Sequence, residues 1–151
     1  MALFLSTFVN KIDNKGRISI PASFRTALAG QEFQGIVLFR SHSYKCLEGF
    51  GWDAMTEMCE RLDHYAMFSA EQDDLATVIF GEAVQLVFDG DGRIVLPREL
   101  ALFAGIKERA AFVGLGRKFQ VWEPETFDRR REAARSTIHT RHLTLPKEQK
   151  D

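Results

Sequence analysis

Cysteines and long apolar runs are scarce in this chain of 151 residues. Its two cysteines, Cys46 and Cys59, stand in no Cys-x-x-Cys spacing, so the sequence predicts neither a disulfide framework nor a zinc knuckle. No apolar window reaches the roughly 18–20 residues that a membrane helix needs. The opening stretch MALFLSTFVNK also lacks the basic start and the small-residue cleavage site of a signal peptide. We therefore expect a cytoplasmic protein without a membrane partner.

The sequence also lacks the motifs of a catalytic, metal or cofactor site. Neither a Walker loop nor a G-x-G-x-x-G phosphate loop is present. The stretch DGDG at 89–92 begins like an EF-hand calcium loop, but arginine, isoleucine and leucine occupy the later positions that need an oxygen donor, glycine and glutamate. His139 and His142 lack a third metal ligand, and nothing ensures that Cys46 and His42 meet. We therefore expect no catalytic residue, metal, cofactor or small-molecule substrate.

Charge is strongly segregated along the chain, although the net charge is only −1. Residues 1–50 carry six Lys/Arg against three Asp/Glu, a balance of +3. Residues 51–92 carry one against ten, a balance of −9, and residues 93–151 carry thirteen against eight, a balance of +5. Because local fields decide which surface attracts phosphate, the first block is the candidate nucleic-acid footprint. We read the acidic block as solvated surface; the alternative is a contact with a basic patch of a neighbouring subunit.

An internal repeat organises the chain. The stretch DNKGRISIP at 13–21 returns as DGDGRIVLP at 89–97, and both read Asp, three residues, Arg, Ile, one residue, an aliphatic residue and Pro. A short helical pattern follows each copy, with Gly30 and Gly105 at the expected helix C-caps. Further on, GIVLFR aligns with AAFVGL, and KCLEGFGW with QVWEPETF. Each unit therefore reads as strand, turn, strand, short helix, strand, strand and helix.

The expected fold class is α+β, with two repeat units, two connecting helices and a charged C-terminal helix and tail. Thirteen phenylalanines and a hydrophobic fraction of 45% supply the core. Ser69 with Gln72 marks the start of the second connecting helix as a capping box. The predicted boundaries are 6–53 for the first unit, 54–81 for the connecting helices, 82–127 for the second unit and 128–151 for the C-terminal helix and tail.

Turn chemistry explains most of the repeated phrase. Gly16 and Gly92 stand where a tight hairpin needs a positive φ. An aspartate at the first position can accept hydrogen bonds from backbone N–H groups of its own loop. The arginine four residues later can pair with this aspartate across the turn, which would hold its guanidinium in one rotamer for a phosphate or for the O6/N7 edge of guanine.

The two copies differ in charge. Lys11, Lys15, Arg17 and Arg25 surround the first loop and only Asp13 opposes them. In the second loop, two aspartates outnumber one arginine. The N-terminal hairpin is therefore predicted to contact nucleic acid, and the C-terminal hairpin to build mainly structure. The candidate DNA-binding residues are Lys11, Asp13, Lys15, Arg17, Arg25 and Arg93.

These residues resemble the MraZ family of bacterial transcriptional regulators, through STFVNKIDNKGRISIPASFR, DGDGRIVLP, CLEGFGW and FQVWEPETF. The resemblance spans roughly Phe4 to Phe127, and the family's two DxxxR motifs fall on Asp13 with Arg17 and on Asp89 with Arg93. It implies tandem AbrB-like swapped-hairpin β-barrel modules that form a pseudo-symmetric unit.

The resemblance also implies a function. Members of the family bind short G-rich direct repeats in double-stranded DNA upstream of the division and cell-wall gene cluster, which includes their own gene. They bind as ring-shaped homo-oligomers, so the resemblance implies association with the nucleoid. Relatives often carry arginines where this chain reads EQDDLATVIF at 71–80, so no DNA role is expected for that helix. The alternative function is an oligomeric protein-interaction scaffold that uses its acidic helices and binds no specific DNA.

Overall fold

The computed structural model describes residues 3–149 and contains two similar sets of elements. The first set is β1 (Thr7–Lys11), β2 (Arg17–Ser19), α1 (Ala22–Leu28), β3 (Gly35–Arg40) and β4 (Leu47–Phe50). The second set is β5 (Val84–Val87), β6 (Arg93–Val95), α4 (Arg98–Ala104), β7 (Arg109–Gly114) and β8 (Phe119–Trp122). The helices α2 (Trp52–Leu62) and α3 (Ala70–Ile79) connect the two sets, and α5 (Pro124–Arg141) follows β8. The predicted order of elements in each unit is confirmed.

The two halves exchange strands. A six-stranded sheet has the order β1-β7-β8-β4-β3-β5, and β2 with β6 forms a separate two-stranded ribbon. All of these pairs are antiparallel, and β1, β2 and β5 each pair with a strand from the other half. Each half thus completes the sheet of the other, so neither can bury its apolar side chains alone. The α+β class with two swapped units is confirmed.

The strand registers correct part of the repeat alignment. Lys11 pairs with Arg109 as Val87 pairs with Gly35, so β3 corresponds to residues 109–114, one residue earlier than AAFVGL. Phe50 pairs with Val37 as Trp122 pairs with Ala111, so β4 corresponds to β8 rather than to a segment three residues further on. The alignment from the sequence was wrong here because the residues that the second half lacks are missing from two loops, before β7 and before β8. The loops before β3 and β4 have six residues each, and those before β7 and β8 have four each.

A cluster of phenylalanine rings holds the first helix against the sheet. Phe24 of α1 is fully buried, and its ring centroid lies 5.1 Å from that of Phe4, 5.8 Å from Phe8, 6.5 Å from Phe112 and 5.3 Å from Phe119. These four rings come from the N-terminal segment, β1, β7 and β8. The core is therefore continuous across both halves and supports the β2–β6 ribbon from behind through the buried Ile18 and Ile94.

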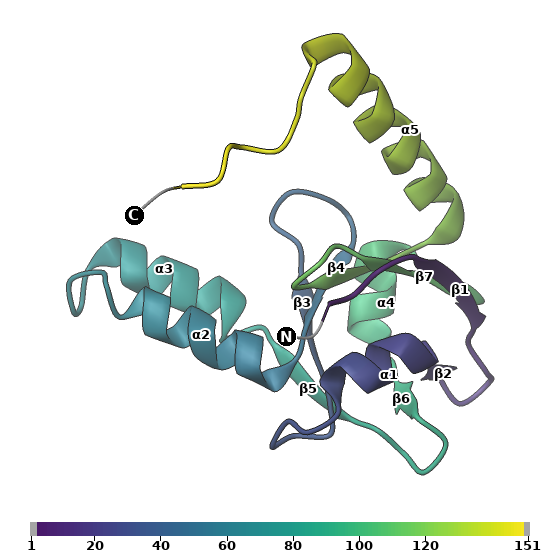
Figure 1. Cartoon of the computed structure of the whole chain (residues 1–151). Coiled ribbons are helices and arrows are strands. Elements are labelled where there is room, and N and C mark those ends of the chain that lie inside the picture. The colour runs from purple at the N-terminus through teal and green to yellow at the C-terminus, as the bar shows by residue number, and fades with distance from the viewer. Residues whose placement is uncertain (1–2, 150–151) are drawn as a thin grey trace.

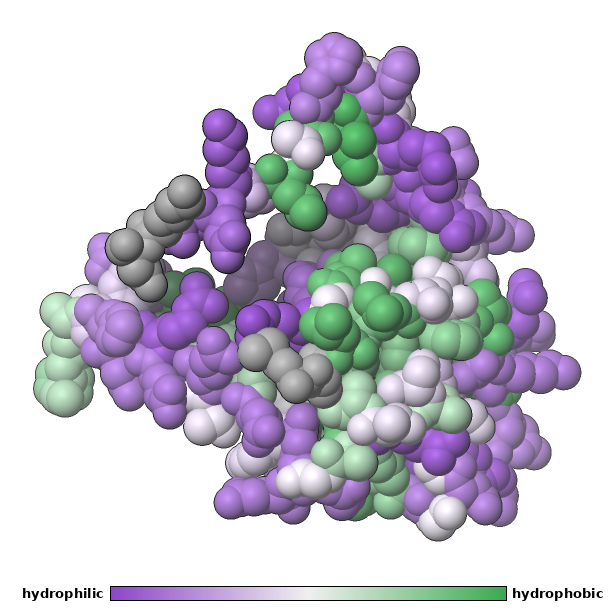
Figure 2. All heavy atoms as spheres, viewed as in Figure 1, coloured by the Kyte–Doolittle hydropathy of each residue, from purple (hydrophilic) through white to green (hydrophobic). Residues whose placement is uncertain are grey.

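Three helices leave the sheet. The helices α2 and α3 lie side by side and extend to one side, whereas α5 extends from the body in a different direction (Figure 1). On the face in Figure 2, hydrophilic residues predominate on α5 and on the α2–α3 pair, and hydrophobic residues gather over the body between them. Residues 143–149 have neither helix nor strand. Within the described part of the chain, no helix has the length and apolarity needed to cross a membrane.

The helix ends follow the predicted caps with two exceptions. The Ser69 side chain accepts from the Gln72 N–H at 3.3 Å, which confirms this N-cap, and Gly105 is a left-handed C-cap at φ 68°. Gly30 is not the C-cap of α1, because Ala29 takes that position in an extended conformation. The C-terminal helix begins at Pro124, earlier than the expected residue 128, because the Glu123 side chain accepts from two backbone N–H groups of its first turn.

A polar network crosses the centre of the sheet. The carboxylate of Glu48 accepts from Ser41 Oγ at 2.8 Å, Lys118 Nζ at 3.0 Å and Gln120 Nε2 at 3.0 Å, and Gln120 Oε1 accepts from Trp122 Nε1 at 2.9 Å. Burial alone would raise the pKa of Glu48, but the three donors outweigh it and lower the pKa below its usual 4.5. The carboxylate is therefore ionised in the folded protein at neutral pH.

The Glu48 network predicts a pH-dependent stability. Because the folded-state pKa is lowered, the carboxylate contributes stability above pH 4.5, and this contribution is lost as the pH falls through the folded-state value. We expect Glu48→Gln to unfold more easily than the native chain at pH 7, and the gap between the two free energies of unfolding to narrow below pH 4.5. Urea denaturation between pH 3 and pH 7 measures this gap; a constant gap would contradict the assignment.

Candidate nucleic-acid interface

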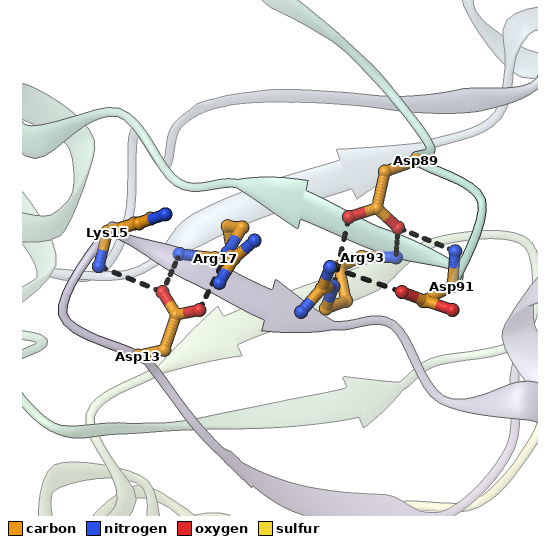
Figure 3. Close-up of polar contacts among 6 residues, drawn as sticks. All are labelled: Asp13, Lys15, Arg17, Asp89, Asp91 and Arg93. Carbon is orange, nitrogen blue, oxygen red and sulfur yellow. Dashed lines mark hydrogen bonds and ion pairs between the residues drawn. The ribbon is translucent and has the colours of Figure 1, made fainter.

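The β2–β6 ribbon brings the two repeated loops onto one surface. Arg17 pairs with Val95 and Ser19 with Arg93, so the two loops lie at opposite ends of the ribbon. Since alternate strand residues share a face, these four side chains lie on one face, and Ile18 and Ile94 on the buried one. Figure 3 shows the two arginine side chains on the same side of the ribbon. The structure thus offers two arginines, one from each half, on a single exposed face.

The first loop fixes its arginine through one aspartate. Asp13 Oδ1 accepts from the N–H groups of Lys15 at 3.0 Å and Arg17 at 2.8 Å, and Asp13 Oδ2 accepts from Arg17 Nε at 2.7 Å. Gly16 allows the turn by adopting φ 80°. The Arg17 side chain is 32% exposed, and its Nη1 and Nη2 make no hydrogen bond within residues 3–149. One edge of the guanidinium is therefore held, and the other is open to a ligand.

The second loop repeats this geometry with an added acceptor. Asp89 Oδ1 accepts from the N–H groups of Asp91 and Arg93, and Asp89 Oδ2 accepts from Arg93 Nε at 2.9 Å (Figure 3). The Arg93 side chain is 29% exposed, but its Nη2 also donates to Asp91 Oδ2 at 3.2 Å. A phosphate or base at Arg93 would compete with this carboxylate, whereas Arg17 has no such competitor among the described residues.

Both loop aspartates are held in the ionised form. The backbone N–H of Arg17, partly opposed by desolvation, lowers the pKa of Asp13 below 3.8, and the backbone N–H of Arg93 does the same for Asp89. The arginine side chains add to both shifts. At neutral pH each aspartate is therefore a permanent acceptor that keeps its arginine in one rotamer.

Arg25 lies against the second loop, so its expected place around the first loop is wrong. The Ile20 N–H donates to the Gly92 carbonyl at 3.1 Å, which brings the chain entering α1 across the second loop. A Cβ atom added at Gly92 would stand 2.6 Å from the guanidinium of Arg25. The cause is the strand exchange, because β2 pairs with β6 rather than forming a closed hairpin with β1.

The side chains of the two lysines of the predicted site make no hydrogen bond or ion pair within residues 3–149. Lys15 is exposed at the tip of the first loop (Figure 3), and Lys11 is exposed on β1, where it pairs with Arg109 of β7. Sequence reasoning missed Ser19, which shares the exposed face, and Asn10, whose Nδ2 donates to the Ser19 carbonyl at 2.7 Å. Ser19 could have been found because it alternates with the buried Ile18 and Ile20. The sequence gives no sign that Arg93 is its partner across the ribbon.

The other candidate chemistry does not converge on a site. Desolvation by burial raises the pKa of the Cys46 thiol to about 12, so this cysteine stays protonated and is a poor nucleophile. Glu48 adds to this shift as a nearby negative charge. Among residues 3–149, no group of three or more histidine, cysteine, aspartate or glutamate side chains is placed to hold a metal ion.

Comparisons with known proteins agree over nearly the whole chain. The sequence model of a family described as "MraZ protein, putative antitoxin-like" matches residues 3–73 and 79–144. The chain is 43% identical over 148 residues to a protein named Transcriptional regulator MraZ from Rickettsia akari (strain Hartford), which covers 96% of this chain and 97% of the relative. It is 44% identical over 149 residues to a protein of the same name from Gluconacetobacter diazotrophicus, which covers 97% of this chain and 93% of the relative.

Proposed function

The chain belongs to the MraZ family, and from that premise we propose that it is a transcriptional regulator that binds double-stranded DNA through the exposed face of the β2–β6 ribbon. The observation that carries this proposal is the geometry of Arg17, whose Nε is held by Asp13 and whose remaining N–H groups have no partner within residues 3–149. A two-stranded ribbon fits the major groove of B-DNA, where a guanidinium can bind O6 and N7 of one guanine. The name of the relatives also agrees with the expectation that the chain is not an enzyme.

The proposed target is a set of short G-rich direct repeats upstream of the division and cell-wall gene cluster, the chain's own gene included. A guanine-reading arginine supports the G-rich preference. Arg17 is the principal reader, Lys15, Lys11 and Arg93 are further DNA-binding residues, and Asp13 positions Arg17. The regulator would be associated with the nucleoid in the cytoplasm.

We further propose that the protein acts as a ring-shaped homo-oligomer. One ribbon covers few base pairs, and several ribbons that bind spaced repeats together gain affinity by multivalency. The acidic block at 51–92 and the basic block at 93–151 could attract each other between neighbouring subunits. The boundaries 6–53, 54–81, 82–127 and 128–151 remain proposals for the two units, the connecting helices and the C-terminal segment, although the helices at two of these boundaries begin earlier, at Trp52 and Pro124.

Salt-dependent binding to duplex DNA tests this function. We expect tighter binding to a duplex from upstream of the chain's own gene than to a shuffled duplex of equal composition. The logarithm of the affinity should fall linearly with the logarithm of salt concentration, by a slope of about 0.9 per phosphate contacted. Fluorescence anisotropy between 50 and 200 mM salt measures both. Equal binding to the two duplexes together with a flat salt response would instead favour a protein-interaction scaffold.

A further inference from the structure

We infer that Arg25 is a phosphate-binding residue of the second loop, supplied by the first half of the chain to a loop whose own sequence lacks a second cation. This inference rests on the proposed DNA-binding function and identifies how the acidic second loop takes part in it. In the sequence, the first loop carries more positive charge than the second. In the folded chain, Arg25 lies against the second loop and reduces this difference.

The contacts of Arg25 place its guanidinium directly on the loop. Arg25 Nε donates to the Ile20 carbonyl at 3.1 Å, which fixes the direction of the side chain. The carbon at the centre of the guanidinium, together with Nε and Nη1, would each lie 2.6 Å from a Cβ atom built at Gly92. Gly92 is buried, whereas Gly16 at the same position of the first loop is only half-buried. Arg25 therefore covers the backbone of the second loop.

The two halves of the chain carry their additional cation at different positions. The tip of the first loop has Lys15, and the same position of the second loop has Asp91. The helix α1 has Arg25, and the same position of α4 has Ala101. A Cβ atom built at Gly16 would meet only the Leu96 carbonyl and the Val95 side chain, both at 3.7 Å, so no cation covers this position as Arg25 covers Gly92. Each loop thus has two cations near it, but from different positions in the sequence.

This placement suits a phosphate contact better than a purely structural role. One edge of the guanidinium binds the Ile20 carbonyl, and Nη1 and Nη2 make no hydrogen bond within residues 3–149. A planar guanidinium with one edge fixed loses little further entropy when the other edge binds a phosphate. Asp91, exposed at the loop tip, offers Arg25 no ion pair within 4.0 Å in the described structure. The open edge is therefore available to DNA.

The test compares the salt dependence of DNA binding in charge-matched variants. Arg25→Gln removes the cation but keeps a side-chain donor for the Ile20 carbonyl, and we expect the salt slope to fall by about 0.9, one phosphate contact. Asp91→Lys added to Arg25→Gln returns a cation to the loop tip and frees Arg93 Nη2, so it should raise the slope at least to the native value. Arg117→Gln makes the same charge change in the β7–β8 loop, at the end of β7 away from Arg109, and should leave the slope unchanged.

Three results would overturn the inference. If the native chain shows a salt slope and Arg25→Gln shows the same one, Arg25 does not bind phosphate and the proposed function stands without it. If the native chain binds no duplex, the proposed function fails and this inference with it. Should Arg25→Gln fold poorly, phenylglyoxal modification of the native chain, read by peptide mass spectrometry, decides: we expect DNA to protect Arg25 but not Arg117. Equal modification of Arg25 with and without DNA would also overturn the inference.

Discussion

Arg17→Ala should lower the affinity for the repeat-containing duplex at least about a hundredfold. A bidentate contact with guanine contributes about 1–3 kcal/mol of discrimination, and the loss recurs in every subunit that binds the DNA. The side chains of Arg17 and Asp13 are both partly exposed, so the removal of Arg17 should leave the thermal midpoint and the oligomer mass nearly unchanged. Fluorescence anisotropy and light scattering on the same preparation separate the two effects.

Two matched variants sharpen this prediction. Arg17→Lys keeps the positive charge without the planar fork, so it should retain the salt slope and lose most of the preference for the G-rich duplex. Arg93→Ala should have the smaller effect, because Asp91 already occupies one of the Arg93 amino groups. A larger loss from Arg93→Ala than from Arg17→Ala would mean that the second loop, and not the first, reads the bases.

The sequence predicted the local structure of each unit because that structure depends on short-range chemistry. The repeated phrase specified both loops, and the positive φ values of Gly16 and Gly92, 80° and 73°, confirm the expected turns. Asp13 and Asp89 also accept hydrogen bonds from N–H groups of their own loops, as the Asp-x-x-x-Arg spacing suggests. The residues that interact in such a loop are only a few positions apart in the chain, so the sequence alone predicts their contacts.

The arrangement of the two units could be predicted only from the family resemblance. The same alternation that makes β2 and β6 strands also suits a closed hairpin with the preceding strand, and nothing in the residues selects the partner across the halves. This is why Arg25 was assigned to the first loop in sequence although it covers Gly92 of the second. Loop shortening before β7 and β8 likewise shifted the apparent alignment, since apolar runs of similar composition match at more than one register.

The largest loss of stability is expected from Phe24→Ala. This ring is fully buried between four other phenylalanines that belong to both halves, so its removal leaves a cavity that no single half can close. Substitutions of this kind cost about 3–5 kcal/mol, a large part of the roughly 5–15 kcal/mol that stabilises an ordinary domain. Urea denaturation at fixed protein concentration measures the loss.

A matched control distinguishes core packing from a general effect on the short helices. Leu102 on α4 is 69% exposed, so Leu102→Ala should change the free energy of unfolding by no more than about 0.5 kcal/mol. Because α1 carries both Phe24 and Arg25, a displaced α1 should also weaken DNA binding in Phe24→Ala even where the chain remains folded. A loss of stability below about 1 kcal/mol for Phe24→Ala would contradict the continuous core, and with it the rigid support that the ribbon needs to hold its arginines in place.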